Sequence, residues 1–202
     1  MLFFVWGASG SGKTTAMRSL QERLPDLVAH DFDEVGVPAG ADQLWRHRAA
    51  ERWLQVVLEH QSEGRDVLLT GQLPHGELLA CPSADQLDGI ASCLLDCTDV
   101  EERFARIRGR ERGTGSATPE MAAWAQWMRG HARDPQWHPE VITEVGAPEM
   151  CWERWTSWPT GDPRWRVEVI DNAGTELDET VERVLAWIVG ERERADPQSS
   201  TS

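Results

Sequence analysis

Apolar residues along this chain gather into short runs, and longer stretches with helical spacing lie between the runs. The runs have the length and continuity of strands buried on both faces of a sheet, and they lie at residues 2–6, 27–30, 67–70, 92–97 and 166–170. Helices are predicted to begin near Lys13, Asp42, Thr98, Thr118 and Leu177. Strands that alternate with helices predict an α/β fold, with a parallel sheet that helices cover on both faces.

Capping and breaking residues mark where these elements end. Thr98, with Glu101 three residues later, is a capping-box signal for the helix that follows the fourth apolar run. The stretch from about 133 to 164 is rich in Trp and Pro, so we predict an irregular insertion with a short helix near 149–155. Its tryptophans either fill a small core or stack against a flat ligand. We predict one domain over residues 1–190 and a polar, disordered tail over residues 191–202.

Composition and charge narrow the classes of protein that fit. The 202 residues suffice for one α/β domain with a hydrophobic core. A net charge of -14 argues against a nucleic-acid surface, because such a surface needs Lys and Arg to neutralise phosphates. The 4 cysteines form no CxxC pair, and the first apolar run is too short for a signal peptide or a membrane span. We therefore expect a cytoplasmic protein with reduced thiols and no membrane contact, and the oligomeric state stays open.

A phosphate-binding loop follows the first apolar run. The segment Gly7-Ala8-Ser9-Gly10-Ser11-Gly12-Lys13-Thr14 satisfies the GxxxxGK[ST] pattern between a predicted strand and a predicted helix. Its glycines let backbone N–H groups turn toward phosphates, Lys13 supplies a charge, and the Thr14 hydroxyl is a magnesium ligand. The predicted nucleotide contacts in this segment are Gly7, Ser9, Gly10, Ser11, Gly12, Lys13, Thr14 and Thr15.

Two carboxylates follow the second apolar run. If Asp31-Phe32-Asp33 is extended, alternation points both acids to one side, beside the phosphate loop when strand two neighbours strand one or lies one strand away. One of the two acids would then hold Mg²⁺ through water, and the other would accept the proton of a substrate hydroxyl. The alternative is that both acids only cap the turn that follows.

The ordered set of strand, phosphate loop, DxD pair, arginine-rich helix and final turn at residues 171–175 resembles a known family. It is similar to the P-loop kinases of the nucleoside-monophosphate kinase fold, whose relatives include shikimate and gluconate kinases and chloramphenicol phosphotransferase. The resemblance spans residues 1–115 and 166–190. It implies a three-layer P-loop NTPase fold with a central five-stranded parallel sheet and an Arg-bearing lid at about residues 106–132.

The resemblance also implies roles for particular residues. Asp33 would meet the substrate hydroxyl, Asp31 would lie near the magnesium waters, and Arg106 and Arg110 would reach the transferring phosphoryl group from the base of the lid. The alternative for the arginines is a solvated basic helix face. The turn that contains Asn172 and Thr175 would wrap the base of the donor, ATP or GTP.

Four further residues are candidates for contact with the acceptor substrate. Gly71 and Gln72 end the third strand, where Gly71 would let a ligand approach the backbone and Gln72 would offer a polar group. Arg46 and Arg48 open the helix that faces the acceptor in these kinases, although arginines on such helices often face only water. No acidic Walker-B residue follows the apolar run 67–69, which favours the kinase branch over motor and signalling NTPases.

These observations predict a kinase that transfers a phosphoryl group from ATP, with Mg²⁺, to a hydroxyl of a small molecule. A nucleoside, a sugar acid or an antibiotic-like natural product would fit. Two alternatives remain, a polynucleotide end kinase and a nucleotide-binding regulatory NTPase. The acidic composition argues against the first, and the lack of an NKxD-type guanine signature argues against a GTPase-like switch.

Overall fold

The computed structural model describes residues 1–109 and 117–195. Within them, five parallel strands form one sheet in the order β2-β3-β1-β4-β5. The strands are β1 Leu2–Trp6, β2 Val28–Asp31, β3 Val67–Gly71, β4 Ile90–Asp96 and β5 Val167–Asp171. The predicted five-stranded parallel sheet is therefore confirmed, and β2 lies one strand away from β1. Because all five strands are parallel, their carboxyl ends lie at the same edge of the sheet, which is where ligands bind in such sheets.

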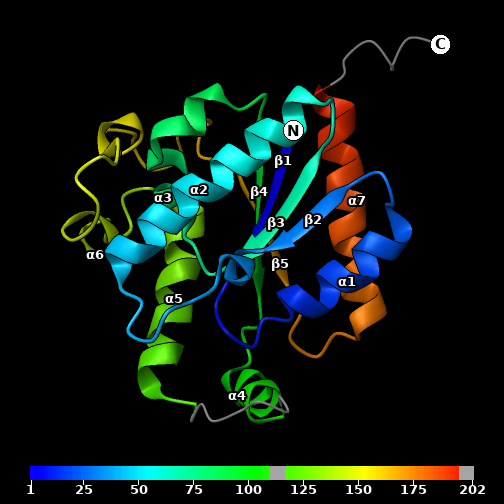
Figure 1. Ribbon diagram of the computed structural model, residues 1–202. Helices are drawn as coiled ribbons and strands as arrows, with labels where there is room; N and C mark the ends of the chain where they lie inside the picture. Colours follow the sequence, from blue (N-terminus) through cyan, green and yellow to red (C-terminus); the bar gives the residue numbers. More distant parts are fainter. Residues whose placement is uncertain (110–116, 196–202) are drawn as a thin grey trace.

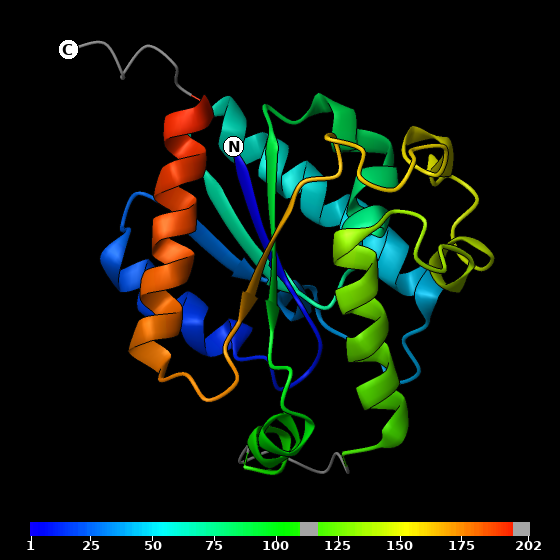
Figure 2. The same ribbon diagram turned by 180° about the vertical axis from the view of Figure 1, so that it is seen from behind.

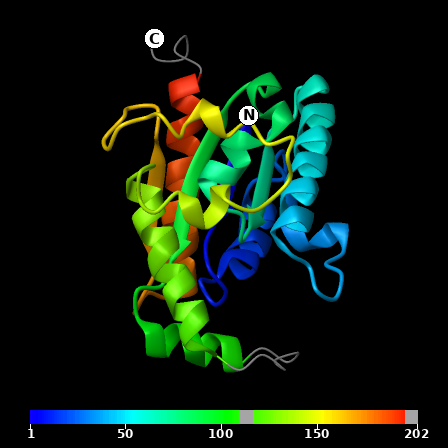
Figure 3. The ribbon, with the colours of Figure 1, turned by 90° about the vertical axis from the view of Figure 1, so that its left-hand side faces the viewer.

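Helices cover both faces of the sheet, as Figures 1 and 2 show. The α-helices are α1 Lys13–Arg23, α2 Gln43–Ser62, α3 His75–Ala80, α4 Val100–Arg108, α5 Pro119–Arg133, α6 Glu140–Thr143 and α7 Leu177–Ala195. Short 3-10 helices are η1 Phe32–Val35, η2 Pro82–Gln86 and η3 Trp152–Arg154. Helices α1 and α7 pack on one face, and α2, α3 and α5 lie on the other (Figure 3). No described helix is long and apolar enough to cross a membrane.

Side-chain alternation along β1 divides the core into two layers. Phe3 and Val5 pack with apolar residues of α1 and α7, whereas Phe4 and Trp6 pack with those of α2, α3 and α5. All four side chains are buried. Because both faces are covered, the strand reads as one apolar run rather than as an alternating pattern, which is why the sequence revealed it so clearly.

Three details differ from the sequence-based expectations. Helix α4 has Asp99 as its N-cap, whose carboxylate accepts the Glu102 amide at 2.9 Å, so the capping box at Thr98 is wrong. The predicted tail begins too early, since α7 continues to Ala195 and Arg192 forms an ion pair with Asp66 at 2.9 Å. Helix α3 was not predicted, because its six residues are too few to show helical periodicity. Residues 196–202 lie outside the described part.

The predicted insertion is irregular, with α6 and η3 as its only helical turns among the described residues. The short helix expected near residues 149–155 is reduced to η3. Trp155 is buried in the core on the α2, α3 and α5 side of the sheet, Trp152 and Trp158 pack partly buried against that core, and Trp137 is exposed. Of the two interpretations, the structure favours core filling for Trp152, Trp155 and Trp158.

Candidate active site

The phosphate loop joins β1 to α1 and depends on glycine at positions where a side chain has no room. At Gly7, a Cβ would lie 2.2 Å from the Leu95 carbonyl oxygen, and at Gly10 it would lie 2.7 Å from Cγ of Arg103. Gly10 and Gly12 also have φ of 83° and 90°, in the left-handed region. Gly12 is the N-cap of α1, so the loop ends on the amino terminus of an 11-residue helix. Backbone N–H groups and the helix dipole there favour a bound anion.

Lys13 is the first residue of α1, and its side chain is 8% exposed. Its ammonium donates to the carbonyl oxygens of Gly7 at 2.8 Å and Ala8 at 3.1 Å, and to the Ser11 hydroxyl at 3.3 Å. The charge is therefore held inside the loop by oxygen atoms of the loop itself. A phosphate group that enters the loop meets this positive charge at short range in a partly desolvated setting.

Asp31 connects β2 to the phosphate loop across the intervening strand β3. Its carboxylate accepts the Thr14 hydroxyl at 2.8 Å and the Thr70 hydroxyl at 3.3 Å. The same carboxylate caps η1, since it accepts the amide of Asp33 at 3.1 Å. The two sequence-based alternatives for Asp31, a capping role and a place beside the phosphate loop, are thus both present in one side chain.

Asp33 does not lie on an extended segment, so the alternation argument for the DxD pair is wrong. The chain turns into η1 directly after Asp31. The turn nevertheless leaves Asp33 beside the loop, because one small cavity is lined by Ser9, Lys13, Thr14, Asp31, Asp33, Gly71 and Gln72. Two carboxylates, a threonine hydroxyl and a lysine therefore converge at the carboxyl edge of the sheet.

The oxygen donors of this cavity suit Mg²⁺ bound together with phosphates. Mg²⁺ prefers oxygen ligands and is usually held by one or two carboxylates plus substrate phosphates and water. Thr14 and Asp31 supply a hydroxyl and a carboxylate 2.8 Å apart. No group of three or more His, Cys, Asp or Glu in the described residues could hold a metal ion on protein ligands alone.

A second cavity, of about 310 Å³, lies on the other side of the phosphate loop. Arg106 on α4 donates to the side-chain oxygen of Asn172 at 3.0 Å and to its backbone carbonyl at 3.1 Å. Asn172 in turn donates to the Ser11 carbonyl at 2.9 Å. The lining residues are Gly10, Gly12, Thr15, Arg106, Asn172, Thr175, Leu177 and Thr180. The structure thus brings the predicted donor-site residues of the loop, of α4 and of the final turn together, while Arg110 lies outside the described residues.

Hydrogen bonds fix the final turn against α4. Burial alone would raise the pKa of Asp171, but hydrogen bonds from the Thr98 hydroxyl and amide and from the Ala173 amide hold that pKa below its usual value. Thr98 is therefore a partner of the turn rather than a helix cap. The charged carboxylate anchors the segment that carries Asn172.

Only some of the residues predicted to contact the acceptor line the first cavity. Gln72 lines the first cavity and donates to the Ser9 hydroxyl at 3.0 Å. Gly71 lines it too, but a Cβ there would lie 2.8 Å from Cβ of Phe32, so packing rather than ligand access requires the glycine. Arg48 is 59% exposed and lies 3.5 Å from a carboxylate oxygen of Glu149, apart from the cavity residues.

Arg46 is engaged by a buried carboxylate. It donates from Nε and Nη2 to the two oxygens of Glu77, at 2.7 and 2.5 Å, and its guanidinium lies 5.7 Å from the centre of the Trp124 ring. A similar pair joins Arg129 of α5 to Asp96 at the end of β4, at 2.5 Å. Sequence reasoning missed both partner carboxylates. Asp96 had a usable signal, since it ends a strand at the ligand-binding edge.

Arg103 is a further residue that sequence reasoning passed over. It is buried, packs against Gly10 and donates from Nη1 to the Cys97 carbonyl at 3.2 Å. Its spacing of four from the buried Ile107 places it on the inner face of α4, whereas Arg106 reaches the donor cavity. The sequence contains this spacing, but several arginines lie in the same stretch, and their number made the inward-facing position of Arg103 hard to recognise.

Comparisons with known proteins bear on the fold. No protein-family model matches the chain, and no curated protein matches it. Among solved structures, a sugar kinase from Janibacter sp. HTCC2649 shares 19% identity over 93% of both chains, with a TM-score of 0.51. The protein APE1195 shares 15% identity over 94% of this chain and 95% of its own, with a TM-score of 0.56. An uncharacterized protein from Eubacterium ventriosum ATCC 27560 shares 14% over 93% and 98%, with a TM-score of 0.50. The chain therefore has the α/β P-loop fold of the sugar kinase.

Proposed function

We propose that the protein is a kinase that transfers the γ-phosphoryl group of ATP to a hydroxyl of a small molecule. The observation that carries the proposal is the convergence of Lys13, Thr14, Asp31, Asp33 and Gln72 on one cavity at the carboxyl edge of the sheet. The similarity to the sugar kinase fold supports it. Phosphoryl transfer needs chiefly positioning and neutralisation of charge, and these residue types provide both.

Each residue has a role that follows from its place. Lys13 and Arg106 balance the negative charge of the donor phosphates, and Arg106 with Asn172 closes the donor cavity against α4. Asp31 orients the Thr14 hydroxyl for Mg²⁺, which, when bound, neutralises and aligns the phosphate oxygens. Asp33 receives the acceptor hydroxyl, and Gln72 offers a polar contact beside it. GTP would bind the same phosphate loop.

The ion pairs around the proposed acceptor side favour an uncharged acceptor. Arg46 is matched one to one by Glu77 and Arg129 by Asp96, so neither pair carries a net positive charge that would attract a carboxylate or phosphate. The half-buried ring of Trp124 beside Arg46 gives a flat apolar surface. A neutral nucleoside, sugar or antibiotic-like natural product fits this setting better than a sugar acid.

The test is turnover of ATP with Mg²⁺ by the purified protein against a panel of neutral and acidic hydroxyl compounds. Mass spectrometry of each acceptor should find a gain of about 80 Da, the mass of an added phosphoryl group, on one of them. Lys13→Ala should remove this product. Tight ATP binding with no phosphorylated acceptor would contradict the proposal and favour a regulatory NTPase, whereas phosphorylation of a 5′-hydroxyl oligonucleotide would favour an end kinase.

A further inference from the structure

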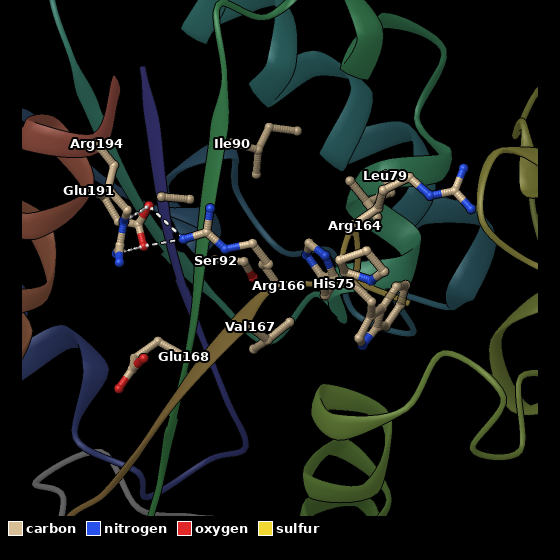
Figure 4. Close-up of a pocket in the computed structure, with 13 residues that line it drawn as sticks. His75, Leu79, Ile90, Ser92, Arg164, Arg166, Val167, Glu168, Glu191 and Arg194 are labelled. Carbon is tan, nitrogen blue, oxygen red and sulfur yellow. Dashed lines mark hydrogen bonds and ion pairs between the residues drawn. The ribbon is translucent and has the colours of Figure 1, made fainter. Parts of the chain in front are cut away.

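A larger cavity lies near the amino ends of β4 and β5, remote along the strands from the phosphate loop at the carboxyl end of β1 (Figure 4). Its volume is about 620 Å³, which is in the range of sites for small organic ligands. Buried His75 and Ser92 line it together with half-buried Leu79 and Ile90, and the exposed side chains of Arg166 and Arg194 line it too. We call it the amino-edge cavity.

His75 is the unusual residue of this cavity. It is 3% exposed, and neither ring nitrogen has a hydrogen-bond partner within residues 1–109 and 117–195. Its ring contacts that of Trp165 edge-on, with centroids 4.7 Å apart. Burial lowers the pKa of His75 to about 3, so near neutral pH the ring is uncharged and presents one donor and one acceptor. Both nitrogens are themselves buried, so His75 adds a neutral ring to the cavity wall, and its NMR signals can report on what fills the cavity.

Two guanidinium groups share one carboxylate at the same cavity. Arg166 donates from Nη2 to both oxygens of Glu191, at 3.1 and 3.3 Å, and Arg194 also bonds Glu191. Figure 4 shows Glu191 between the two arginines and Glu168 pointing away from them. The trio carries a net positive charge in a chain whose net charge is -14. Glu191 also restrains two long side chains, so less conformational entropy is lost when they bind an anion.

We propose that the amino-edge cavity binds a small organic anion that carries hydroxyl groups, with the anionic group on Arg166 and Arg194 and the rest of the molecule against the wall that contains His75. The cavity accommodates one phosphate or carboxylate group plus a polar body, with Leu79 and Ile90 covering carbon atoms. None of its lining residues lines the phosphate-loop cavities. The site is therefore separate from the proposed kinase site and does not depend on that function.

The test uses the full chain labelled with ¹⁵N-histidine and glucose 6-phosphate as the probe, with glucose and inorganic phosphate as comparisons. His75→Gln identifies the His75 imidazole signals among those of the 6 histidines. Glucose 6-phosphate should shift these signals and bind by calorimetry, and it should bind more tightly than glucose. Arg166→Met/Arg194→Met should weaken binding at least tenfold, about 1.4 kcal/mol.

Matched variants separate this site from the phosphate loop. Lys13→Ala should leave glucose 6-phosphate binding at His75 unchanged, and so should Arg18→Met, which changes an exposed arginine of α1. Arg194→Met alone keeps the pair of Arg166 with Glu191 and serves if the double variant unfolds. The proposal is overturned if His75 signals do not move at about 10 mM probe. It is also overturned if glucose binds equally well, or if Lys13→Ala weakens binding while the arginine variants do not.

Discussion

Removal of the Glu77 carboxylate should destabilise the packing of α2 against α3. Glu77 is 0% exposed and accepts two hydrogen bonds from Arg46, and Nε2 of His47 lies 3.1 Å from its Oε1. The amide of Ala147 donates to Nδ1 of His47 at 3.2 Å, which places the ring proton on Nε2, toward Glu77. Glu77→Ala would leave Arg46 without its acceptor and would remove the carboxylate that lies beside the His47 ring.

The expected loss follows from the burial of the partners. Removal of one member of a buried ion pair costs about 3–5 kcal/mol, because the other charge stays buried and unpaired. The Arg46 side chain is 25% exposed and can turn partly toward water, so we expect about 3 kcal/mol. In a domain of this size, that corresponds to a fall in melting temperature of roughly 6–12 °C. Glu77→Gln keeps an acceptor for Arg46 and should lose less.

Urea unfolding followed by circular dichroism measures the difference in the free energy of unfolding. The matched control is Arg48→Ala, which removes an exposed ion pair with Glu149 and should change stability by less than about 0.5 kcal/mol. If Glu77→Ala lost no more than this control, the network would not hold α2 to α3. The reasoning from burial would then be refuted.

Three further predictions concern the proposed reaction and the buried histidines. Asp33→Asn should lower kcat at least about 100-fold while ATP affinity stays within about threefold, and near-normal turnover in steady-state kinetics would exclude its role. Arg106→Ala should weaken ATP binding about tenfold by calorimetry, whereas Arg108→Ala, at an exposed position, should not. Burial lowers the pKa of His75 and His131 from 6.5 to about 3. Between these two values the unfolded chain binds more protons than the folded chain, so the free energy of unfolding decreases as the pH is lowered. The free energy of unfolding should drop by about 2–3 kcal/mol from about pH 7.5 to pH 5.5, and a drop that His131→Gln leaves unchanged would disprove this cause.

The parts of the fold that depend on local pattern were predictable from the sequence. Strand β1 coincides with its apolar run, and Thr118 is the N-cap of α5 as its place before Pro119 indicated. The phosphate loop was predictable because Gly10 and Gly12 adopt the left-handed backbone conformation that the loop itself requires. In each case the physical cause lies within about ten residues of chain.

The parts that depend on contacts between distant segments were not predictable. The place of Asp33 was right although the extended geometry behind it was wrong, because η1 turns the chain back toward the loop. Arg46 was predicted to face an acceptor, but its partner Glu77 lies 31 residues away on a helix too short to detect. No local pattern in the sequence distinguishes an arginine that awaits a ligand from one that a buried carboxylate already holds.

The Trp-rich insertion bears on the proposed active site through α3 rather than through direct contact. Trp155 donates from its indole to the Gly76 carbonyl at 2.8 Å, and Nε2 of His131 accepts the Gly76 amide at 3.2 Å. A Cβ on Gly76 would lie 2.6 Å from the Trp155 ring, so the insertion and α5 pack against α3 too closely for any side chain at this position. Gly76 lies next to Glu77 and four residues after Gln72, which lines the phosphate-loop cavity. Through Trp155, the insertion therefore holds in place helix α3, which carries Glu77 and begins shortly after Gln72.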